Sequence, residues 1–251
     1  RVASRDVHGR YLFKRGIHEP PATRLLLRYF RLAPQDVVID VGGNVGYFSL
    51  LAHRCCGPDV AIHAFEAEPN NGALLRDNLR RNGATSVVVH ELAVSDREGT
   101  AELFLYKSSN RGKHSLVPLG DAQSVEVETT TLDAFWERQG LGTRVPTLIK
   151  MDIEGGEYAA FRGAESVLAR CSFVMIEWSP KFLRRAEVSA RSFAERMAAV
   201  GLMPCRITED GRLVRLALEE LVGLEPSQNI ALVRPSSENS EWIDQLMASP
   251  D

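Results

Sequence analysis

The chain has 251 residues, of which 44% are hydrophobic and 25% are charged, and its net charge is -3. This length is enough for one α/β domain with a small appendage. The mild net acidity argues against a nucleic acid as the partner, and no apolar run reaches the ~18 residues of a membrane span. We therefore expect a globular protein without a membrane-spanning segment and without a basic, nucleic-acid-binding surface.

Strands and helices alternate along the first third of the chain. In order we expect a helix from Pro20, a strand at 37–41, a helix at 47–53, a strand at 61–65, a helix from Pro69 to Asn82 and a strand at 87–89. This rhythm predicts right-handed crossovers between parallel strands, and hence a parallel sheet.

The middle of the chain changes character. Residues 100–106 and 124–131 alternate polar and apolar side chains like half-exposed strands, and residues 107–121 between them are polar. Loops of this length in compact domains are often functional. We therefore expect a hairpin-like insertion whose tip is a mobile lid.

The parallel pattern resumes after the insertion. The expected elements are a strand at 147–152, a helix at 157–169, a strand at 173–178, a helix at 192–200 and two strands at 203–207 and 229–233. The last two strands are expected to form an antiparallel pair at the edge of the sheet.

The four cysteines, Cys55, Cys56, Cys171 and Cys205, show no metal-site spacing, and adjacent cysteines are poorly placed to share one tetrahedral ion. Reduced cysteines and a start without a signal-peptide pattern favour a cytoplasmic location. Because the first residue is Arg1 rather than Met, the sequence leaves a preceding targeting segment open.

The turn after the first strand reads Asp40-Val41-Gly42-Gly43-Asn44-Val45-Gly46. In open α/β sheets, nucleotide-like ligands bind at such a turn, outside the carboxyl end of the strand. A dinucleotide fingerprint would need a glycine at Val41, which disfavours NAD. Asp40 suits a cationic amino-acid moiety better than a pyrophosphate, and this favours S-adenosylmethionine. An ordinary turn without a ligand is the alternative.

Glu66 ends the second strand of the alternating region. An acid at this position commonly accepts hydrogen bonds from ribose hydroxyls. The alternative is that Glu66 stabilises the start of the next helix, although Glu68, beside Pro69, suits that role better. Glu66 is therefore predicted to contact a ribose.

A second acidic block, Lys150-Met151-Asp152-Ile153-Glu154-Gly155-Gly156-Glu157, ends a later strand. Its carboxylates repel one another unless a cationic cofactor, a metal, a proton in transit or a helix N-terminus uses them. Glu157 suits the start of the following helix. Asp152 and Glu154 therefore remain for function.

Five motifs occur in an order typical of one family. They are the Asp40 turn, Phe65-Glu66-x-x-Pro69-Asn70, Ala93-Val94-Ser95-Asp96, Thr131-Leu132-Asp133 and the Lys150 block. With them, residues 19–235 resemble the FkbM family of S-adenosylmethionine-dependent methyltransferases. The Lys-x-Asp-x-Glu-Gly pattern is specific to that family, whereas the glycine turn marks only the wider superfamily.

The resemblance implies a Rossmann-like, class I methyltransferase sheet of seven strands, six parallel and one antiparallel, with helices on both faces. It also implies O-methyl transfer to a hydroxyl of a small molecule, sugar or secondary metabolite. By this match, residues 1–32 are an N-terminal segment and helix that cap the active site, 33–235 the methyltransferase domain with its insertion at 98–131, and 236–251 a polar tail. The residues expected at the cofactor are Asp40, Gly42, Gly43, Asn44, Gly46, Glu66 and Ala93.

An alcohol acceptor must lose a proton to a carboxylate or a histidine in the site. The candidates are Asp152, which we place first, Glu154, Glu177 at the end of the next strand, and His114 in the lid. A solvated loop is the alternative for His114, and a plain strand end is the alternative for Glu177. No third metal ligand stands out by its spacing, so we expect a metal-free site.

Two other functions stay open at this point. One is N-methylation of an amine, peptide or nucleic acid, and the other is a non-catalytic module that binds a partner. The acids at three strand ends argue against the second, since a silent domain has no need of them. The sequence does not identify the methyl acceptor. It does not determine the oligomeric state either, and a homodimer stays open.

Overall fold

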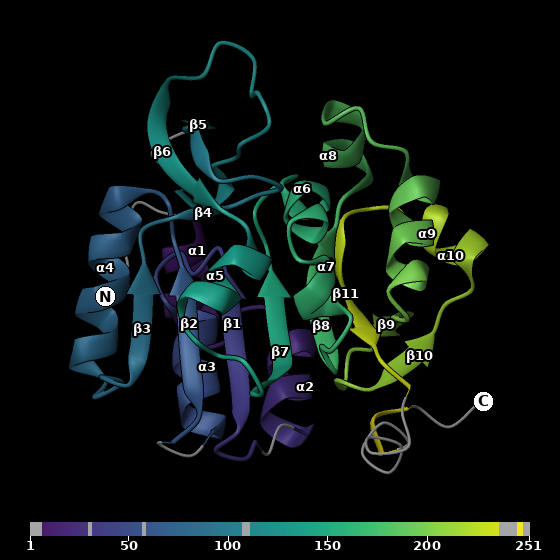
Figure 1. Ribbon diagram of the computed structural model, residues 1–251, viewed down its shortest axis with the longest axis horizontal. Helices are drawn as coiled ribbons and strands as arrows, with labels where there is room; N and C mark the ends of the chain where they lie inside the picture. Colours follow the sequence, from purple (N-terminus) through teal and green to yellow (C-terminus); the bar gives the residue numbers. More distant parts are fainter. Residues whose placement is uncertain (1–6, 30–31, 57–58, 107–110, 236–244, 248–251) are drawn as a thin grey trace.

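The computed structural model describes residues 7–29, 32–56, 59–106, 111–235 and 245–247 (Figure 1). An eight-stranded sheet has the order β10-β9-β11-β8-β7-β1-β2-β3. In that order the strands are β10 (Leu213–Arg215), β9 (Met203–Ile207), β11 (Gln228–Val233), β8 (Phe173–Trp178), β7 (Val145–Met151), β1 (Asp36–Val41), β2 (Ala61–Phe65) and β3 (Val87–His90).

The directions of the strands match the expected methyltransferase sheet. Neighbours from β8 to β3 pair in parallel, whereas β11 pairs antiparallel with both β8 and β9. Six strands therefore run one way and β11 runs against them. The Rossmann-like fold class is confirmed, as is the antiparallel pairing of residues 203–207 with 229–233.

The expected strand count is wrong by one, because β10 adds to the free side of β9. A short turn makes this possible: the Thr208 amide donates to the Arg212 carbonyl, and the Arg212 amide donates to the Thr208 hydroxyl. Leu213 is fully buried at the new edge, and Met247, from the expected polar tail, pairs with it in parallel. The pair at 203–207 and 229–233 is thus not the sheet edge.

Helices cover both faces of the sheet, as the alternation of buried strand side chains requires. Val37, Ile39 and Val41 join one apolar core, whereas Val38 joins the core on the opposite face. The first core is covered by α5 (Leu132–Arg138), α6 (Glu157–Arg162), α7 (Glu165–Leu168), α8 (Pro180–Arg185), α9 (Ala190–Ala199) and α10 (Leu218–Val222). The second is covered by α2 (Pro20–Tyr29), α3 (Tyr47–Cys55) and α4 (Pro69–Arg81).

One expected helix, 157–169, is two short helices, α6 and α7. The break falls at Gly163, where an added Cβ would lie 2.1 Å from the Ser95 carbonyl oxygen. The chain therefore bends where a distant loop presses against it. The carboxylate of Asp133 then accepts the amides of Ser166 and Val167 at 3.0 and 2.9 Å, which satisfies the start of α7.

The insertion contributes β5 (Gly99–Phe104) and β6 (Ser124–Thr130), which form a separate three-stranded sheet with β4 (Ala93–Val94) in the order β4-β6-β5. The expected hairpin is confirmed, since β5 and β6 pair antiparallel. The insertion stands over the carboxyl ends of the parallel strands (Figure 1). Residues 107–110 of the expected lid lie outside the described residues, and its mobility stays a prediction.

A further helix, α1 (Val7–Arg15), precedes α2 in a region where the sequence indicated no helix. Residues 1–6, which precede α1, are outside the described part of the chain. Among the helices of the described residues, none is long and apolar enough to cross a membrane.

Candidate active site

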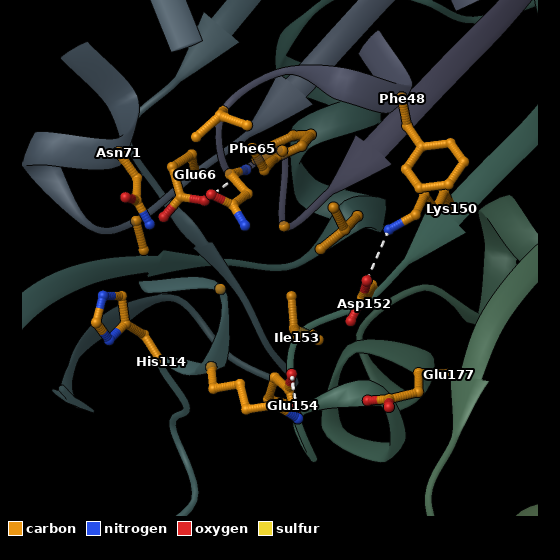
Figure 2. A pocket seen from close by; sticks show the side chains of 18 of the residues that line it. Phe48, Phe65, Glu66, Asn71, His114, Lys150, Asp152, Ile153, Glu154 and Glu177 are labelled. Atoms are coloured by element: carbon orange, nitrogen blue, oxygen red, sulfur yellow. Dashed lines mark hydrogen bonds and ion pairs between the residues drawn. The ribbon is translucent and has the colours of Figure 1, made fainter. Parts of the chain in front are cut away.

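A cavity lies at the carboxyl ends of β1, β2, β7 and β8 (Figure 2). Its wall comes from distant parts of the chain, among them the N-terminal segment, the glycine turn with the start of α3, the end of β2, α4, the β4 region, the insertion and the ends of β7 and β8. The predicted site residues in this wall are Gly42, Gly43, Asn44, Glu66, Ala93, His114, Asp152, Glu154 and Glu177. The fold thus brings nine of the eleven predicted residues to one cavity.

The glycine turn is clamped between two strand ends. The amides of Gly42 and Gly43 both donate to the Phe65 carbonyl, at 2.9 and 2.8 Å. Gly42 has a φ of 84°, and a Cβ there would lie 2.1 Å from the Asp152 carbonyl oxygen. Only glycine fits such an approach, so the turn is held flat against the ends of both neighbouring strands.

Gly46 and Asp40 are the two predicted residues that do not line the cavity. Gly46, with a φ of 89°, packs against Leu75 of α4. Asp40 is 2% exposed beneath the turn, where the Ser49 hydroxyl donates to it at 2.5 Å. Burial raises the pKa of Asp40, and the nearby Lys150 opposes that rise. Direct contact between Asp40 and a ligand stays a prediction.

Glu66 is held in one orientation by the backbone. Its two carboxylate oxygens accept the amides of Asn44 and Glu68, at 2.8 and 2.9 Å. Burial raises the pKa of Glu66 to about 7, and these two hydrogen bonds oppose the rise. Glu68 instead caps α4 by accepting the Asn71 amide at 2.8 Å, as the sequence predicted. Each Glu66 oxygen keeps a lone pair for a ligand hydroxyl.

The opposite part of the cavity holds a cluster of three acids, Asp152, Glu154 and Glu177. One carboxylate oxygen from each lies within 4.8 Å of the other two. Burial and the charge of Asp152 raise the pKa of Glu154 to about 7 and that of Glu177 to about 8. The cluster therefore favours a proton or a cation at neutral pH.

Two lysines enter this cluster from different elements. Lys150 lies 4% exposed in β7, pairs with Asp152 at 3.1 Å and sits over the Phe48 ring at 4.5 Å. Burial lowers the pKa of Lys150, but the surrounding carboxylates outweigh burial and raise it above its ordinary value. Lys113 of the insertion pairs with Glu154 at 3.3 Å. The sequence interpretation gave neither lysine a role, although a lysine within the apolar run of β7 was a signal.

The insertion is also tied to the cluster by a buried serine. The Ser115 hydroxyl, in a residue 1% exposed, donates to the Glu154 carbonyl at 2.6 Å. Glu154 has a φ of 51°, a conformation that costs a non-glycine residue of order 1 kcal/mol or more. This tie helps to hold the strained peptide of Glu154 at the cavity.

His114 lines the cavity but lies apart from the acids, on the side of Asn71 (Figure 2). Its Nδ1 accepts the Tyr106 amide at 3.0 Å. A neutral ring in this arrangement carries its proton on Nε2. The structure therefore does not bring His114 to the carboxylates with which it was grouped as a proton acceptor.

The expectation of a metal-free site rested on the lack of a third ligand by spacing, and Glu177 now supplies a third carboxylate beside Asp152 and Glu154. Carboxylates alone suit a hard cation such as Mg²⁺. The geometry thus permits such an ion, and a metal-free reaction stays a prediction.

A family model described as the methyltransferase FkbM domain matches residues 40–199, which is more than half of the chain. The chain belongs to the FkbM methyltransferase family. Membership in this family implies S-adenosylmethionine as the methyl donor. The matched range contains the glycine turn, Glu66 and the acid cluster, and so it covers most of the cavity wall.

Curated relatives support the same family. The 31-O-demethyl-FK506 methyltransferase FkbM of Streptomyces tacrolimicus is 43% identical over 84 residues, 33% of this chain and 32% of that protein. The hexuronic acid methyltransferase AglP of Haloferax volcanii is 28% identical over 160 residues, 63% of this chain and 62% of that protein. The alignments thus cover less than two thirds of either relative.

Solved structures are similar at low sequence identity. Methyltransferase FkbM from Methylobacillus flagellatus superposes with a TM-score of 0.44 at 20% identity, over 64% of this chain and 38% of that one. A structure assigned as an rRNA methylase from Clostridium thermocellum superposes with a TM-score of 0.51 at 6% identity, over 88% of this chain and 98% of that one. The second likeness shows the shared fold and no more.

Proposed function

We propose that this FkbM-family protein transfers a methyl group from S-adenosylmethionine to a hydroxyl oxygen of a small molecule, such as a sugar or a secondary metabolite. One observation carries the proposal. A single cavity joins a backbone-fixed carboxylate, Glu66, to a cluster of three carboxylates, Asp152, Glu154 and Glu177. Within this cluster, the pKa values of Glu154 and Glu177 are raised. An enzyme that transfers a methyl group from S-adenosylmethionine to an alcohol must hold the cofactor in place and must accept the proton of the alcohol.

The wall of the cavity fits S-adenosylmethionine. Glu66 offers two oriented oxygens to the ribose diol, and the flat glycine turn beside it allows a ligand to approach the backbone closely. The acids beyond the turn complement the positive charge of the ammonium and sulfonium groups. When bound, the cofactor supplies an electrophilic methyl carbon attached to sulfur.

The chain itself aligns the acceptor and takes its proton. During methylation of the acceptor, its hydroxyl proton would pass to a carboxylate of the acid cluster. Glu177 suits this step best, because Lys150 and Lys113 pair with Asp152 and Glu154, and paired carboxylates are weaker bases. A pKa of about 8 also places Glu177 close to the pH at which general bases work well.

The named substrates of the relatives, a demethylated FK506 and a hexuronic acid, are small organic molecules, which supports a small-molecule acceptor here. Transfer to an amine, a peptide or a nucleic acid, and binding without catalysis, are the competing functions.

Incubation with methyl-labelled S-adenosylmethionine and a panel of alcohols, sugars, amines, peptides and RNA tests the proposal. We expect label on a hydroxyl oxygen of a small molecule, identified by mass spectrometry. Label on nitrogen, or on RNA alone, would contradict O-methylation. Cofactor binding without transfer to any acceptor class would favour the non-catalytic module.

A further inference from the structure

The N-terminal segment forms part of the cavity wall. Leu12, His18 and Glu19 all line it. The His18 ring lies edge-on to the rings of Tyr47 and Phe48, with centroids 5.5 and 6.1 Å apart. The segment is therefore seated on the first turn of α3, directly after the glycine turn.

Thr23 of α2 holds the N-terminal segment in this position through hydrogen bonds. The Thr23 hydroxyl donates to the His18 carbonyl at 2.6 Å and lies 3.1 Å from the Tyr47 hydroxyl. Thr23 is 2% exposed, so its polar contacts are shielded from water. The backbone that carries Glu19 is thus held by α2, and α2 in turn contacts Tyr47 in the first turn of α3, directly after the glycine turn.

Glu19 is held in an unusual conformation with an unsatisfied oxygen. Its φ is 44°, which costs a residue with a Cβ of order 1 kcal/mol. One carboxylate oxygen lies 3.5 Å from His18 Nε2, whereas Oε2 is buried without a hydrogen-bond partner among the described residues. A buried acceptor without a donor is destabilising, so a ligand that donates an N–H or O–H would relieve it.

The charges around Glu19 indicate which donor is missing. Three carboxylates, those of Glu19, Asp40 and Asp152, act on the single ammonium of Lys150. Burial and the charge of Asp152 raise the pKa of Glu19 to about 7, whereas Lys150 and a hydrogen bond from the Asn229 side chain oppose this rise. One further cationic donor would reduce this excess of negative charge and satisfy Oε2. The sulfonium of the cofactor has no N–H, so the donor of matching charge is its α-ammonium.

We propose that Glu19 is a cofactor-binding residue that accepts a hydrogen bond from the α-ammonium group of S-adenosylmethionine. This inference rests on the proposed function, because it assumes that the cavity takes that cofactor. It makes the N-terminal segment part of the cofactor site rather than only a cover over the acceptor. Glu66 and Glu19 then hold the two ends of one ligand, on either side of the glycine turn.

Calorimetry with two ligands tests the contact directly, without relying on turnover. The probes are S-adenosylhomocysteine, which keeps the α-amino group, and its analogue without that group. Wild-type protein should bind the analogue about tenfold to a hundredfold more weakly, since a charged hydrogen bond contributes about 1.5–3 kcal/mol. Glu19→Gln should bind S-adenosylhomocysteine more weakly and should lose most of this discrimination.

A matched control is available in Glu187→Gln. Glu187 also has a positive φ, 56°, but it is exposed and outside the cavity wall. This control should keep the wild-type ratio of the two affinities. Because that ratio is the readout, a uniform loss of binding in Glu19→Gln does not imitate the expected result. If Glu19→Gln fails to fold, Glu19→Asp, which keeps the charge but shortens its reach, should reduce the ratio.

The failures of the two proposals are distinguishable. Equal binding of both ligands by the wild type, or an unchanged ratio in both Glu19 variants, would overturn the Glu19 contact and leave the methyltransferase proposal intact. A wild-type protein that binds neither S-adenosylmethionine nor S-adenosylhomocysteine would overturn the proposed function itself.

Discussion

At one end of the cavity Glu66 is held by two backbone amides, whereas at the other end Asp152, Glu154 and Glu177 face one another and two lysines. The Glu66 end is fixed and presents acceptors to neutral hydroxyls. The acid cluster stores repulsion that a proton or a cation relieves. Burial raises the pKa of a carboxylate at both ends, to about 7 for Glu66 and to about 8 for Glu177. The ends differ in their surroundings: backbone amides orient Glu66 for binding, whereas neighbouring carboxylates and lysines surround the acids proposed for proton transfer.

The largest expected effect comes from the acid cluster. Glu177→Gln should lower turnover roughly a hundredfold to ten-thousandfold, the usual contribution of a general base, while cofactor affinity stays within a few-fold of the wild type. Single-turnover rates and calorimetry measure the two quantities, with Glu187→Gln as the exposed control. Full activity would remove Glu177 from the mechanism and move the search to Asp152, for which Asp152→Asn is the matching test.

The pH dependence of the turnover rate tests the same difference between Glu66 and the acid cluster. A base must be deprotonated to act, so the wild-type rate should rise with pH and level off above about 8, the pKa of Glu177. Glu66→Gln should keep this rise, because its own titration does not govern proton transfer. A flat profile in the wild type between pH 6.5 and 9 would contradict the assignment of Glu177.

At the other end, Glu66→Ala should weaken cofactor binding about tenfold to a hundredfold, because charge-assisted hydrogen bonds contribute about 1.5–3 kcal/mol each. Turnover at saturating cofactor should change much less. Calorimetry with S-adenosylhomocysteine checks the affinity, and Glu187→Ala controls for the loss of one acid. Unchanged affinity would break the ribose assignment and, with it, the contrast between the two ends.

A smaller effect should appear in stability without ligand. The folded pKa of Glu177, about 8, lies above its ordinary value of 4.5, so the folded state holds the proton more tightly than the unfolded state. That stabilisation is complete below pH 4.5 and is lost as pH rises through about 8. Between pH 6.5 and 8, wild-type Tm should therefore fall by about 2–4 °C more than that of Glu177→Gln.

This window avoids an opposite contribution. Burial lowers the pKa of His63 from 6.5 to about 4, so His63 reduces stability only as pH falls below 6.5. Equal Tm slopes for the wild type and Glu177→Gln between pH 6.5 and 8 would show that the repulsion in the cluster is relieved in the free protein.

The smallest expected effect is that of a chelator. In a metal-free reaction, EDTA should leave both turnover and cofactor affinity unchanged. Loss of turnover that Mg²⁺ restores, with affinity for S-adenosylhomocysteine kept, would instead place an ion on Asp152, Glu154 and Glu177. Only the metal-dependent outcome would add a further difference between the two ends of the cavity, because Glu66 is not part of the acid cluster.

The Glu66 end could be predicted from the sequence because its parts are close along the chain. The glycine turn and Glu66 each end a strand, and the rule for open α/β sheets places them together. The partners of the acids could not be predicted, because Lys113 and Glu19 reach the cavity from an insertion and from the N-terminal segment. No local pattern of charge or hydrophobicity predicts contacts between residues that lie so far apart in the sequence.

The same distinction explains the errors in the fold. The parallel strands and their crossover helices follow from periodicity within each segment. The break at Gly163 depends on Ser95, a contact between distant parts of the chain, and β10 is too short to show a period. Sequence periodicity therefore finds elements that bury a face, and it misses features imposed by a neighbour.

The hydrogen bond from Ser115 to the Glu154 carbonyl makes two events inseparable. The insertion cannot lift from the cavity without breaking this buried bond and withdrawing Lys113 from Glu154. Opening of the insertion would thus relax the strained backbone of Glu154 and break its ion pair with Lys113 at the same time. Release of the product and the return of these acids to their starting ionisation states would then occur in the same step.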